Sequence, residues 1–290
     1  QDTFYTINSD VLSPLLFAIL FLMLFRIYFE NMPVSYYLTA GFIGSACFLT
    51  KISNIASPLL VLIIIIMKVK KLHKEKRLTH FIPHLSLMAA AAGLTVGLWS
   101  VHNYYLLGNF TGSADKIKYL GWTLKPLNQL WNHPIFSADG AIYFLSDLAK
   151  TFWRGELVWY LKPLSLKTLD SFYVISSIVF CSACFIGIFA KKENVHQKHN
   201  PILLSGFLLI ASSVLFLAIL SLLFDFHDCW APSRGTPFFT SGRIISVVLL
   251  PFILIYIDGI WRIFSFLGKY APLIFVLLMA GVITLSEFWL

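Results

Sequence analysis

Residues 58–77 read PLLVLIIIIMKVKKLHKEKR, an aliphatic run that changes without a break into a cluster of basic residues. The aliphatic part is shorter than the ~20 residues that cross a ~30 Å hydrocarbon layer as a helix, but tilt or local thinning of the bilayer accommodates such a span. The basic part is typical of the short loops that stay on the cytoplasmic side. This stretch therefore predicts a membrane-spanning helix and the side on which it ends.

The composition of the whole chain indicates the same class of protein. Of its 290 residues, 58% are hydrophobic, 16% are aromatic and only 12% are charged, and the mean hydropathy is +0.78. Because so little polar surface remains to solvate a globule of this size, we expect an integral membrane protein. The formal net charge is +8. The basic residues gather beside apolar runs rather than on a nucleic-acid-binding face, so we expect no nucleic-acid partner.

Apolar runs of roughly the length of a membrane span recur along the chain. We predict an all-α, polytopic transmembrane helix bundle of about eight spans, at residues 11–29, 34–50, 54–69, 85–104, 171–190, 202–224, 244–262 and 271–290. No internal repeat and no low-complexity tract divides the chain, which is expected to form a single integral membrane domain over residues 1–290. The chain begins QDTFYT and ends within an apolar run, so we expect it to be the C-terminal part of a longer protein.

The orientation of the bundle follows from the distribution of Lys and Arg. Three basic loops fall on one side, which is then cytoplasmic. They carry Lys68, Lys70, Lys71, Lys74, Lys76 and Arg77 after the third span, Lys191, Lys192 and Lys198 after the fifth, and Arg262 and Lys269 before the last. The outer side then carries the segment TINSD at 6–10, the turn at 51–54, and the loops 105–170 and 225–243.

The outer loop 105–170 is longer than a simple connection and is expected to contain structure of its own. Asp139-Gly140 can cap a helix that runs to about Trp153, with apolar residues on one face at positions 141, 144, 145, 148 and 152. Such a helix is expected to lie flat on the outer membrane surface. Four Trp residues of this loop fit the same interfacial placement: Trp122, Trp131, Trp153 and Trp159.

The four cysteines do not predict a disulfide framework. Cys47, Cys181 and Cys184 lie inside apolar runs, and Cys229 lies in a loop. The spacing Cys181-Ser-Ala-Cys184 matches a redox motif, but within a span it favours close helix packing through small residues. The sequence Asn109-Phe-Thr111 fits a glycosylation sequon, a pattern that also arises often by chance.

Two charged residues on the outer side each have a structural and a functional interpretation. Asp10, in Asn8-Ser9-Asp10, lies where a helix N-terminus is expected, where it can cap the helix. It can also be a carboxylate at the rim of a cavity that accepts a proton, orients an acceptor hydroxyl or holds a metal. Lys51 ends a glycine-containing span and either extends to the membrane interface or binds a phosphate group.

The loop HDCWAPSRGTPFFTSGR at 227–243 places two arginines between two long apolar runs. An unpaired guanidinium at the mouth of a span costs roughly 3 kcal/mol, so Arg243 is expected to face a polar cavity, a partner carboxylate or an anion. A phosphate ligand matches the donors of Arg243, and Arg234 is a second candidate. His227-Asp228-Cys229 has metal-ligand residue types, but adjacent residues rarely converge on one ion, so no metal site is predicted.

Several of these stretches together resemble a known group. Asn8-Ser9-Asp10 before a span, Leu49-Thr50-Lys51 at a span end and Pro58 in the next span resemble the GT-C type of lipid-carrier-dependent membrane glycosyltransferases. This group includes protein O-mannosyltransferases and relatives of the lipid A aminoarabinose transferase. NYYLLGNFTG at 103–112, TFWRG at 151–155 and SGR at 241–243, with Pro251 beyond, are similar to bacterial members of the group.

The resemblance implies transfer of a sugar from a polyprenyl-phosphate donor to a lipid, glycan or protein acceptor at the outer face of a bacterial inner membrane. It places Lys51, Arg243 and Arg234 at the donor phosphate, and Asp10 as a secondary acid. Members of the group usually carry their principal acid in a first outer loop, which is expected upstream of Gln1, so this piece alone is expected to be inactive. No cofactor is implied besides the lipid-linked donor, and a divalent metal is left open.

Two other functions remain alternatives. A transporter or lipid flippase also needs a polar cavity in a helix bundle, and it predicts broken helices in two related halves with charges near mid-membrane. A non-catalytic assembly subunit needs only apolar surfaces. The charged residues of this chain cluster at one face and no halves are related, which favours the transferase.

Overall fold

The computed structural model describes most of the chain. The described residues are 9–51, 54–111, 119–156, 158–159, 162–163, 166–190, 199–227, 229, 232–268 and 270–288. The long helices are α2 (Ser9–Phe29), α3 (Val34–Thr50), α4 (Ala56–Lys74), α5 (Leu78–Leu107), α7 (Ala138–Arg154), α8 (Lys167–Phe189), α9 (Asn200–Leu223), α10 (Leu249–Phe264) and α11 (Ala271–Phe288). Short 3-10 helices are η1 (Leu127–Asn132), η2 (Pro134–Phe136), η4 (Gly242–Val248) and η5 (Ser265–Leu267).

The chain is an all-α helix bundle, and each predicted apolar run coincides with a helix. Within the described residues, five helices are long and apolar enough to cross a membrane, namely Val11–Phe29, Leu78–Leu107, Lys167–Phe189, Asn200–Leu223 and Gly242–Leu267. Two shorter apolar helices, Val34–Thr50 and Ala271–Leu285, accompany them. The prediction of an all-α membrane bundle agrees with this architecture, whereas the count of eight spans stays a prediction.

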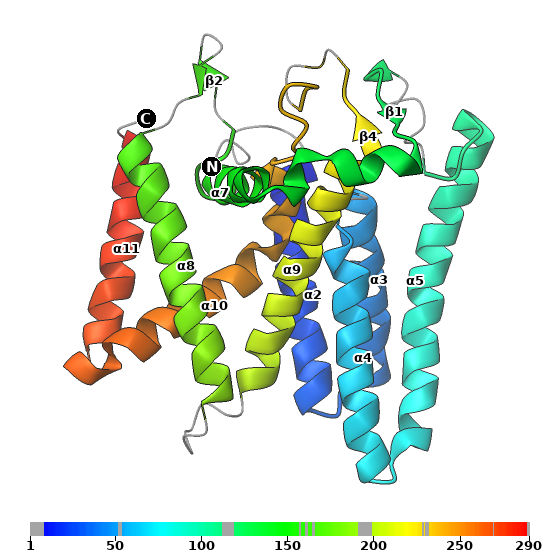
Figure 1. The fold of residues 1–290 in the computed structure, drawn as a ribbon. Helices are drawn as coiled ribbons and strands as arrows, with labels where there is room; N and C mark the ends of the chain where they lie inside the picture. The colour runs from blue at the N-terminus through cyan, green and yellow to red at the C-terminus, as the bar shows by residue number, and fades with distance from the viewer. Residues whose placement is uncertain are drawn as a thin grey trace.

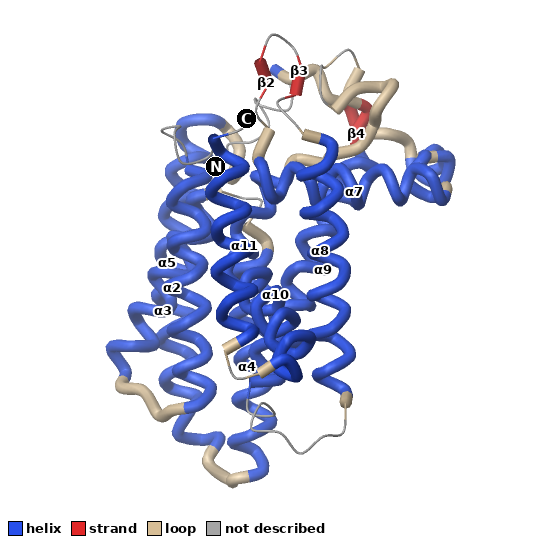
Figure 2. The backbone as a smooth tube through the Cα atoms, turned by 90° about the vertical axis from the view of Figure 1, so that its left-hand side faces the viewer, coloured by secondary structure: helices blue, strands red, loops and turns tan. Residues whose placement is uncertain are grey.

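The helices are arranged so that the two ends of the bundle differ. In Figure 1, α7 lies across one end of the upright helices, together with the strand pair β1 (Thr123–Leu124) and β4 (Phe224–Asp225). Figure 2 shows the second pair, β2 (Val158–Trp159) and β3 (Lys162–Pro163), at the same end, which we call the capped end. The turn between α4 and α5 lies at the opposite end, which we call the basic end.

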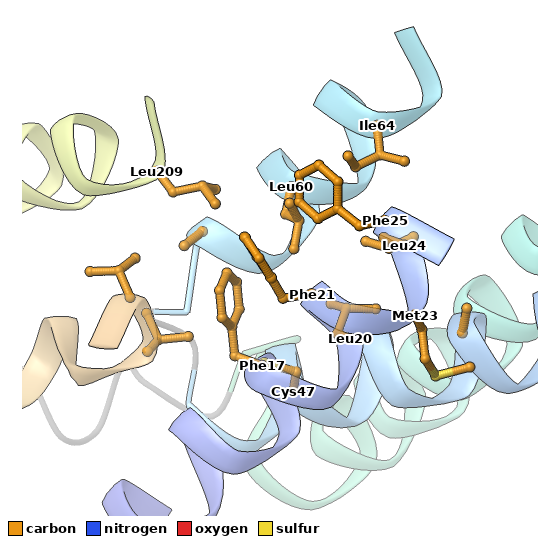
Figure 3. Close-up of a cluster of buried hydrophobic side chains, with 14 of the residues drawn as sticks. Phe17, Leu20, Phe21, Met23, Leu24, Phe25, Cys47, Leu60, Ile64 and Leu209 are labelled. Carbon is orange, nitrogen blue, oxygen red and sulfur yellow. The ribbon is translucent and has the colours of Figure 1, made fainter. Parts of the chain in front are cut away.

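The core of the bundle is built around α2. Phe17, Phe21 and Phe25 follow one another at a spacing of four residues and are almost fully buried. The ring centroids of Phe17 and Phe21 are 6.3 Å apart, and those of Phe21 and Phe25 are 4.8 Å apart. Figure 3 shows Leu60 of α4 and Leu209 of α9 gathered around these rings. Other apolar side chains on the outside of the bundle are exposed, which is expected for a surface that faces lipid rather than water.

Two glycines allow helices to approach closely. A Cβ atom on Gly41 of α3 would overlap the carbonyl oxygen of Met88 on α5, and one on Gly259 of α10 would overlap the carbonyl of Phe180 on α8. Small residues at such positions bring helix backbones together, which increases van der Waals contact where no hydrophobic effect drives association. The pairs α3–α5 and α8–α10 are therefore packed backbone against backbone.

Several predicted boundaries were wrong at the basic end. Helix α4 continues to Lys74 and α5 begins at Leu78, so four of the lysines predicted in a loop lie on the last turns of a helix. Basic side chains are favourable there because they face the negative end of the helix dipole. Arg262 is not in a loop either, since it lies within α10 and pairs with Asp258 one turn earlier. Four lysines of the predicted orientation, Lys191, Lys192, Lys198 and Lys269, lie outside the described residues.

The close approach at Gly41 predicts a stability loss on substitution. Gly41→Ala forces a methyl group against the Met88 carbonyl, so we expect α3 and α5 to separate at a cost of about 1–3 kcal/mol. The control is Gly97→Ala on α5, where a Cβ has open space around it. Thermal unfolding in detergent should show a lower midpoint for Gly41→Ala alone, and equal midpoints for the two variants would contradict this packing.

Candidate functional site

Helix α7 forms the roof of the capped end. Its N-terminus is capped by Ser137, whose Oγ accepts a hydrogen bond from the Gly140 backbone N–H at 3.1 Å, so the predicted cap at Asp139-Gly140 was wrong by two residues. The helix itself extends to Arg154, close to the predicted end. Phe144 and Leu148 are each 3% exposed and pack into the bundle, and Figures 1 and 2 show the helix lying crosswise over it.

The C-terminal part of α7 is joined to the start of η4 by hydrogen bonds. The Thr151 hydroxyl donates to the Thr240 carbonyl at 2.5 Å and accepts from the Gly242 backbone N–H at 3.0 Å. A Cβ on Gly242 would overlap the backbone of Phe152, so only glycine permits this approach. The two stretches TFWRG and SGR, which lie far apart in the sequence, therefore meet at the capped end.

A buried ion pair holds the end of α7 against α8. Arg154 Nε lies 3.0 Å from Asp170 Oδ1, and the two side chains are only 10% and 11% exposed. The adjacent Trp153 stacks on Tyr173 with ring centroids 5.1 Å apart and donates from Nε1 to Ser177 Oγ at 2.8 Å. These contacts fix the direction in which the chain leaves α7, and so fix the position of the next residues.

Lys51, Arg243 and Glu156 come together beside this junction. Lys51 Nζ donates to the Arg243 carbonyl oxygen at 3.4 Å, and Arg243 Nε lies 3.9 Å from Glu156 Oε2. The side chains of Arg243 and Glu156 are 49% and 29% exposed, so both can be reached from outside. Within the described part of the chain, the buried Oε1 of Glu156 and Oγ of Ser241 have no hydrogen-bond partner. Buried polar atoms normally have one, so these two are suited to receive a ligand group.

An apolar pocket of about 130 Å³ lies under the roof. Its walls come from α7, α8, α9, η4 and α10, and include Leu148, Phe152, Val214, Ile245 and Phe252. Ile245 is two residues from Arg243, and Phe152 is four residues from Glu156, so the same two stretches of chain supply residues to the pocket and to the charged cluster. The arrangement combines an apolar recess with cations at the same end.

A separate polar pocket of about 430 Å³ contains Arg234. The guanidinium donates to Asp225 at 3.3 Å and 3.2 Å and contacts His227 Nδ1 at 2.8 Å. Hydrogen bonds from Arg234 hold the pKa of Asp225 below its usual value. The neighbouring side chains Lys125, Gln129 and Asn132 complete a hydrophilic wall.

His133 also lines the polar pocket. Its Nδ1 accepts from the Ile135 backbone N–H at 3.1 Å, and its Nε2 contacts the Pro237 carbonyl at 3.0 Å. One accepting and one donating nitrogen is the pattern of a neutral imidazole, and burial lowers the pKa of His133 accordingly. His133 thereby links the loop before α7 to the segment that leads into Arg243.

The structure places the predicted site residues in different parts of the molecule. Lys51 and Arg243 lie together at the capped end, whereas Arg234 lines the polar pocket in an ion pair with Asp225. Asp10 lies in the first turn of α2, and its side chain lies outside the described residues, as does Asp228. Cys229 interacts with Trp122, and no three metal-ligand side chains converge within the described residues.

Glu156 is the residue that the sequence reasoning missed. It follows the TFWRG stretch directly, and a single carboxylate after a glycine carries no pattern of its own. The only available signal was the expectation that Arg243 requires a carboxylate or an anion near the membrane. That expectation did not indicate which carboxylate, because the pair joins residues that are far apart in the sequence.

The junction at Thr151 predicts a local change when its hydroxyl is removed. Thr151→Val keeps the shape of the side chain but leaves the Gly242 N–H and the Thr240 carbonyl without this partner, which costs about 1–3 kcal/mol for a buried group. We expect faster hydrogen exchange at residues 240–244. Ser146→Ala is the control, since that hydroxyl donates to Tyr143 within α7. Unchanged exchange in Thr151→Val would exclude this role.

Comparisons with known proteins add no relative. No protein-family model, no curated protein and no solved structure matches this chain.

Proposed function

We propose that this protein takes part in the transfer of a sugar from a polyprenyl-phosphate donor to an acceptor, at the capped end of a bundle whose eight apolar helices cross a bacterial inner membrane. The capped end faces outward in this proposal. The observation that carries it is the hydrogen bond from Lys51 to the Arg243 backbone at the same end of the bundle as an apolar pocket roofed by α7. A lipid phosphate requires both elements at once, a cationic group and an apolar recess.

Arg243 and Lys51 are suited to the phosphate of the donor. Negative charge grows on the phosphate as the sugar departs, and cations already in place stabilise that charge at no cost of reorganisation. A guanidinium offers donors that match phosphate oxygens, and hydrogen bonds between charged groups are stronger than neutral ones. Arg243 is about half exposed, so a ligand can reach it without unfolding the roof.

The apolar pocket is suited to the first isoprene unit of the donor. Its walls consist almost entirely of aliphatic and aromatic carbon, including Leu148, Val214 and Phe252. At roughly 25 cal/mol per Å², burial of about one isoprene unit in a pocket of this size contributes a few kcal/mol to binding. A soluble nucleotide-sugar donor has no group that would use such a pocket.

Glu156 is the described carboxylate best placed to accept a proton from an acceptor hydroxyl. One of its oxygens lies 3.9 Å from Arg243, and the other has no hydrogen-bond partner within the described residues. A general base needs an oxygen within reach of the reacting hydroxyl, and the Glu156 side chain is 29% exposed beside Arg243. Asp10 stays the predicted secondary acid. The polar pocket with Gln129 and Asn132 is suited to a hydroxyl-rich group of the sugar or acceptor.

One observation bears on the alternative of transport. Asp258 and Arg262 form an ion pair within the apolar helix Gly242–Leu267, and charges inside a span often mark a transport path. The two residues lie one turn apart on the same helix, where pairing also has a purely structural use. Reconstituted protein distinguishes the functions, because a transferase forms glycosylated product and a flippase moves the intact lipid.

Arg243→Ala in the full-length protein is expected to weaken the binding of undecaprenyl phosphate. Loss of charge-assisted hydrogen bonds costs about 1.5–3 kcal/mol, or roughly tenfold to a hundredfold in affinity. Arg243→Lys should retain part of the affinity because the charge remains. Native mass spectrometry with undecaprenyl phosphate measures this directly, and unchanged binding and transfer in Arg243→Ala would refute the assignment.

Glu156→Gln is the matched control, because it removes the charge on the other side of the same ion pair. Binding of the anionic lipid should be kept or tightened, since a repelling carboxylate is gone, while sugar transfer should fall by about 10²–10⁴-fold with the loss of a general base. If both variants lost binding equally, the cluster would have only a structural role.

Ala149→Phe tests the apolar pocket. Ala149 lines it, so a phenyl ring there should occupy the space of the first isoprene unit. We expect the affinity for both undecaprenyl phosphate and the short geranyl phosphate to fall about tenfold or more, because both place their first isoprene unit there, while the affinity for inorganic phosphate changes little. Unchanged affinity for both lipids would place the isoprenoid chain elsewhere.

A further inference from the structure

A second cavity, of about 180 Å³, lies at the basic end of the bundle, away from the roof. It is lined from the α2–α3 turn, α4 and α5, and four of its lining residues are basic: Lys68, Arg77, His80 and His84. Among the described residues that line it, none is acidic. Lys68 and Arg77 are cationic and have no acidic residue beside them in this lining, which favours an anion inside the cavity.

Lys68 is the deepest of these groups. The residue is 3% exposed, and its ammonium group donates to the carbonyl oxygens of Glu30 at 3.0 Å and Tyr28 at 3.3 Å. These bonds use two of its three N–H donors. Among the described residues, no carboxylate forms a salt bridge with Lys68: the Glu30 side chain pairs with Arg26, and Glu75 attracts Lys68 only from a longer distance. A buried ammonium without a close counter-ion is costly, and an anion in the cavity would offset that cost.

The two histidines are held on the cavity side of α5. They are one helical turn apart, and the ring of His84 packs on Tyr37 with centroids 4.9 Å apart. His84 Nδ1 contacts the His80 carbonyl at 2.9 Å, so Nδ1 is the donor in this contact and Nε2 is the ring nitrogen left for a ligand. When protonated, Nε2 becomes a further donor toward an anion.

We propose that this cavity binds a phosphate group, carried either by the headgroup of an anionic phospholipid or by free inorganic phosphate. Arg77 supplies a planar set of donors at the cavity mouth, Lys68 supplies a point charge at its base, and the histidines complete the shell. The basic end is the predicted cytoplasmic side, where the leaflet is rich in anionic lipids. This site is independent of the proposed sugar transfer at the capped end.

The test compares two double variants that each replace two basic side chains with Gln, one pair inside the cavity and one pair outside it. Arg77→Gln with His80→Gln changes residues that line the cavity, both of which are exposed, so the core is undisturbed. Lys70→Gln with Lys74→Gln changes exposed basic residues of α4 that are not among its lining residues. The full chain is placed in phosphatidylcholine nanodiscs, and bound phosphatidylglycerol is counted by native mass spectrometry after titration.

The cavity variant should bind phosphatidylglycerol about tenfold more weakly or worse, as charge-assisted hydrogen bonds are lost, and the Lys70/Lys74 variant should match the original protein. Equal weakening of both variants would mean general attraction by the basic turn and would overturn the proposal. Inorganic phosphate, added in a second arm, identifies a free-phosphate site if it raises the thermal midpoint of the original protein but not that of the cavity variant. If the cavity variant shows no loss in either arm, the proposal is overturned. Arg77→Gln alone serves as a second variant.

Discussion

The close approach of Gly242 to the backbone of α7 is the contact on which the capped end depends. Because no Cβ separates the two chains there, the Thr151 hydroxyl can bond to Thr240 and Gly242 together. This contact places the Arg243 carbonyl next to Lys51, and it places Ile245 in the wall of the apolar pocket. The charged cluster and the apolar recess are thus two consequences of one backbone contact.

The helices could be predicted from the sequence because the length of an apolar run is a local property. Their ends could not be predicted as well, since α4 and α5 continue beyond the apolar runs into residues such as Lys74 and Leu78, where helix dipole and local hydrogen bonding decide. The number of helices that span the membrane is harder to predict than the helices themselves, because a helix such as α4 combines an aliphatic run with a basic last turn.

The candidate site could be predicted only in part. Lys51 and Arg243 were recognisable because each is a cation at the end of an apolar run on the same side. Arg234 lies in the same loop as Arg243, and only the fold shows that Asp225 and His227 bind it in another pocket. Glu156 has no local pattern at all, so its pairing with Arg243 needed the tertiary structure.

The ion pair of Arg243 and Glu156 gives the proposed chemistry a simple order of events. At 3.9 Å and with both side chains partly exposed, the pair is weak, because water screens exposed charges. A phosphate that enters beside Arg243 competes for the same guanidinium donors and carries more charge than a carboxylate. In the proposed order of events, Glu156 is then released from Arg243 when the donor is bound. The buried pair of Arg154 and Asp170 does not exchange in this way, so the frame around the site stays fixed while this one contact changes.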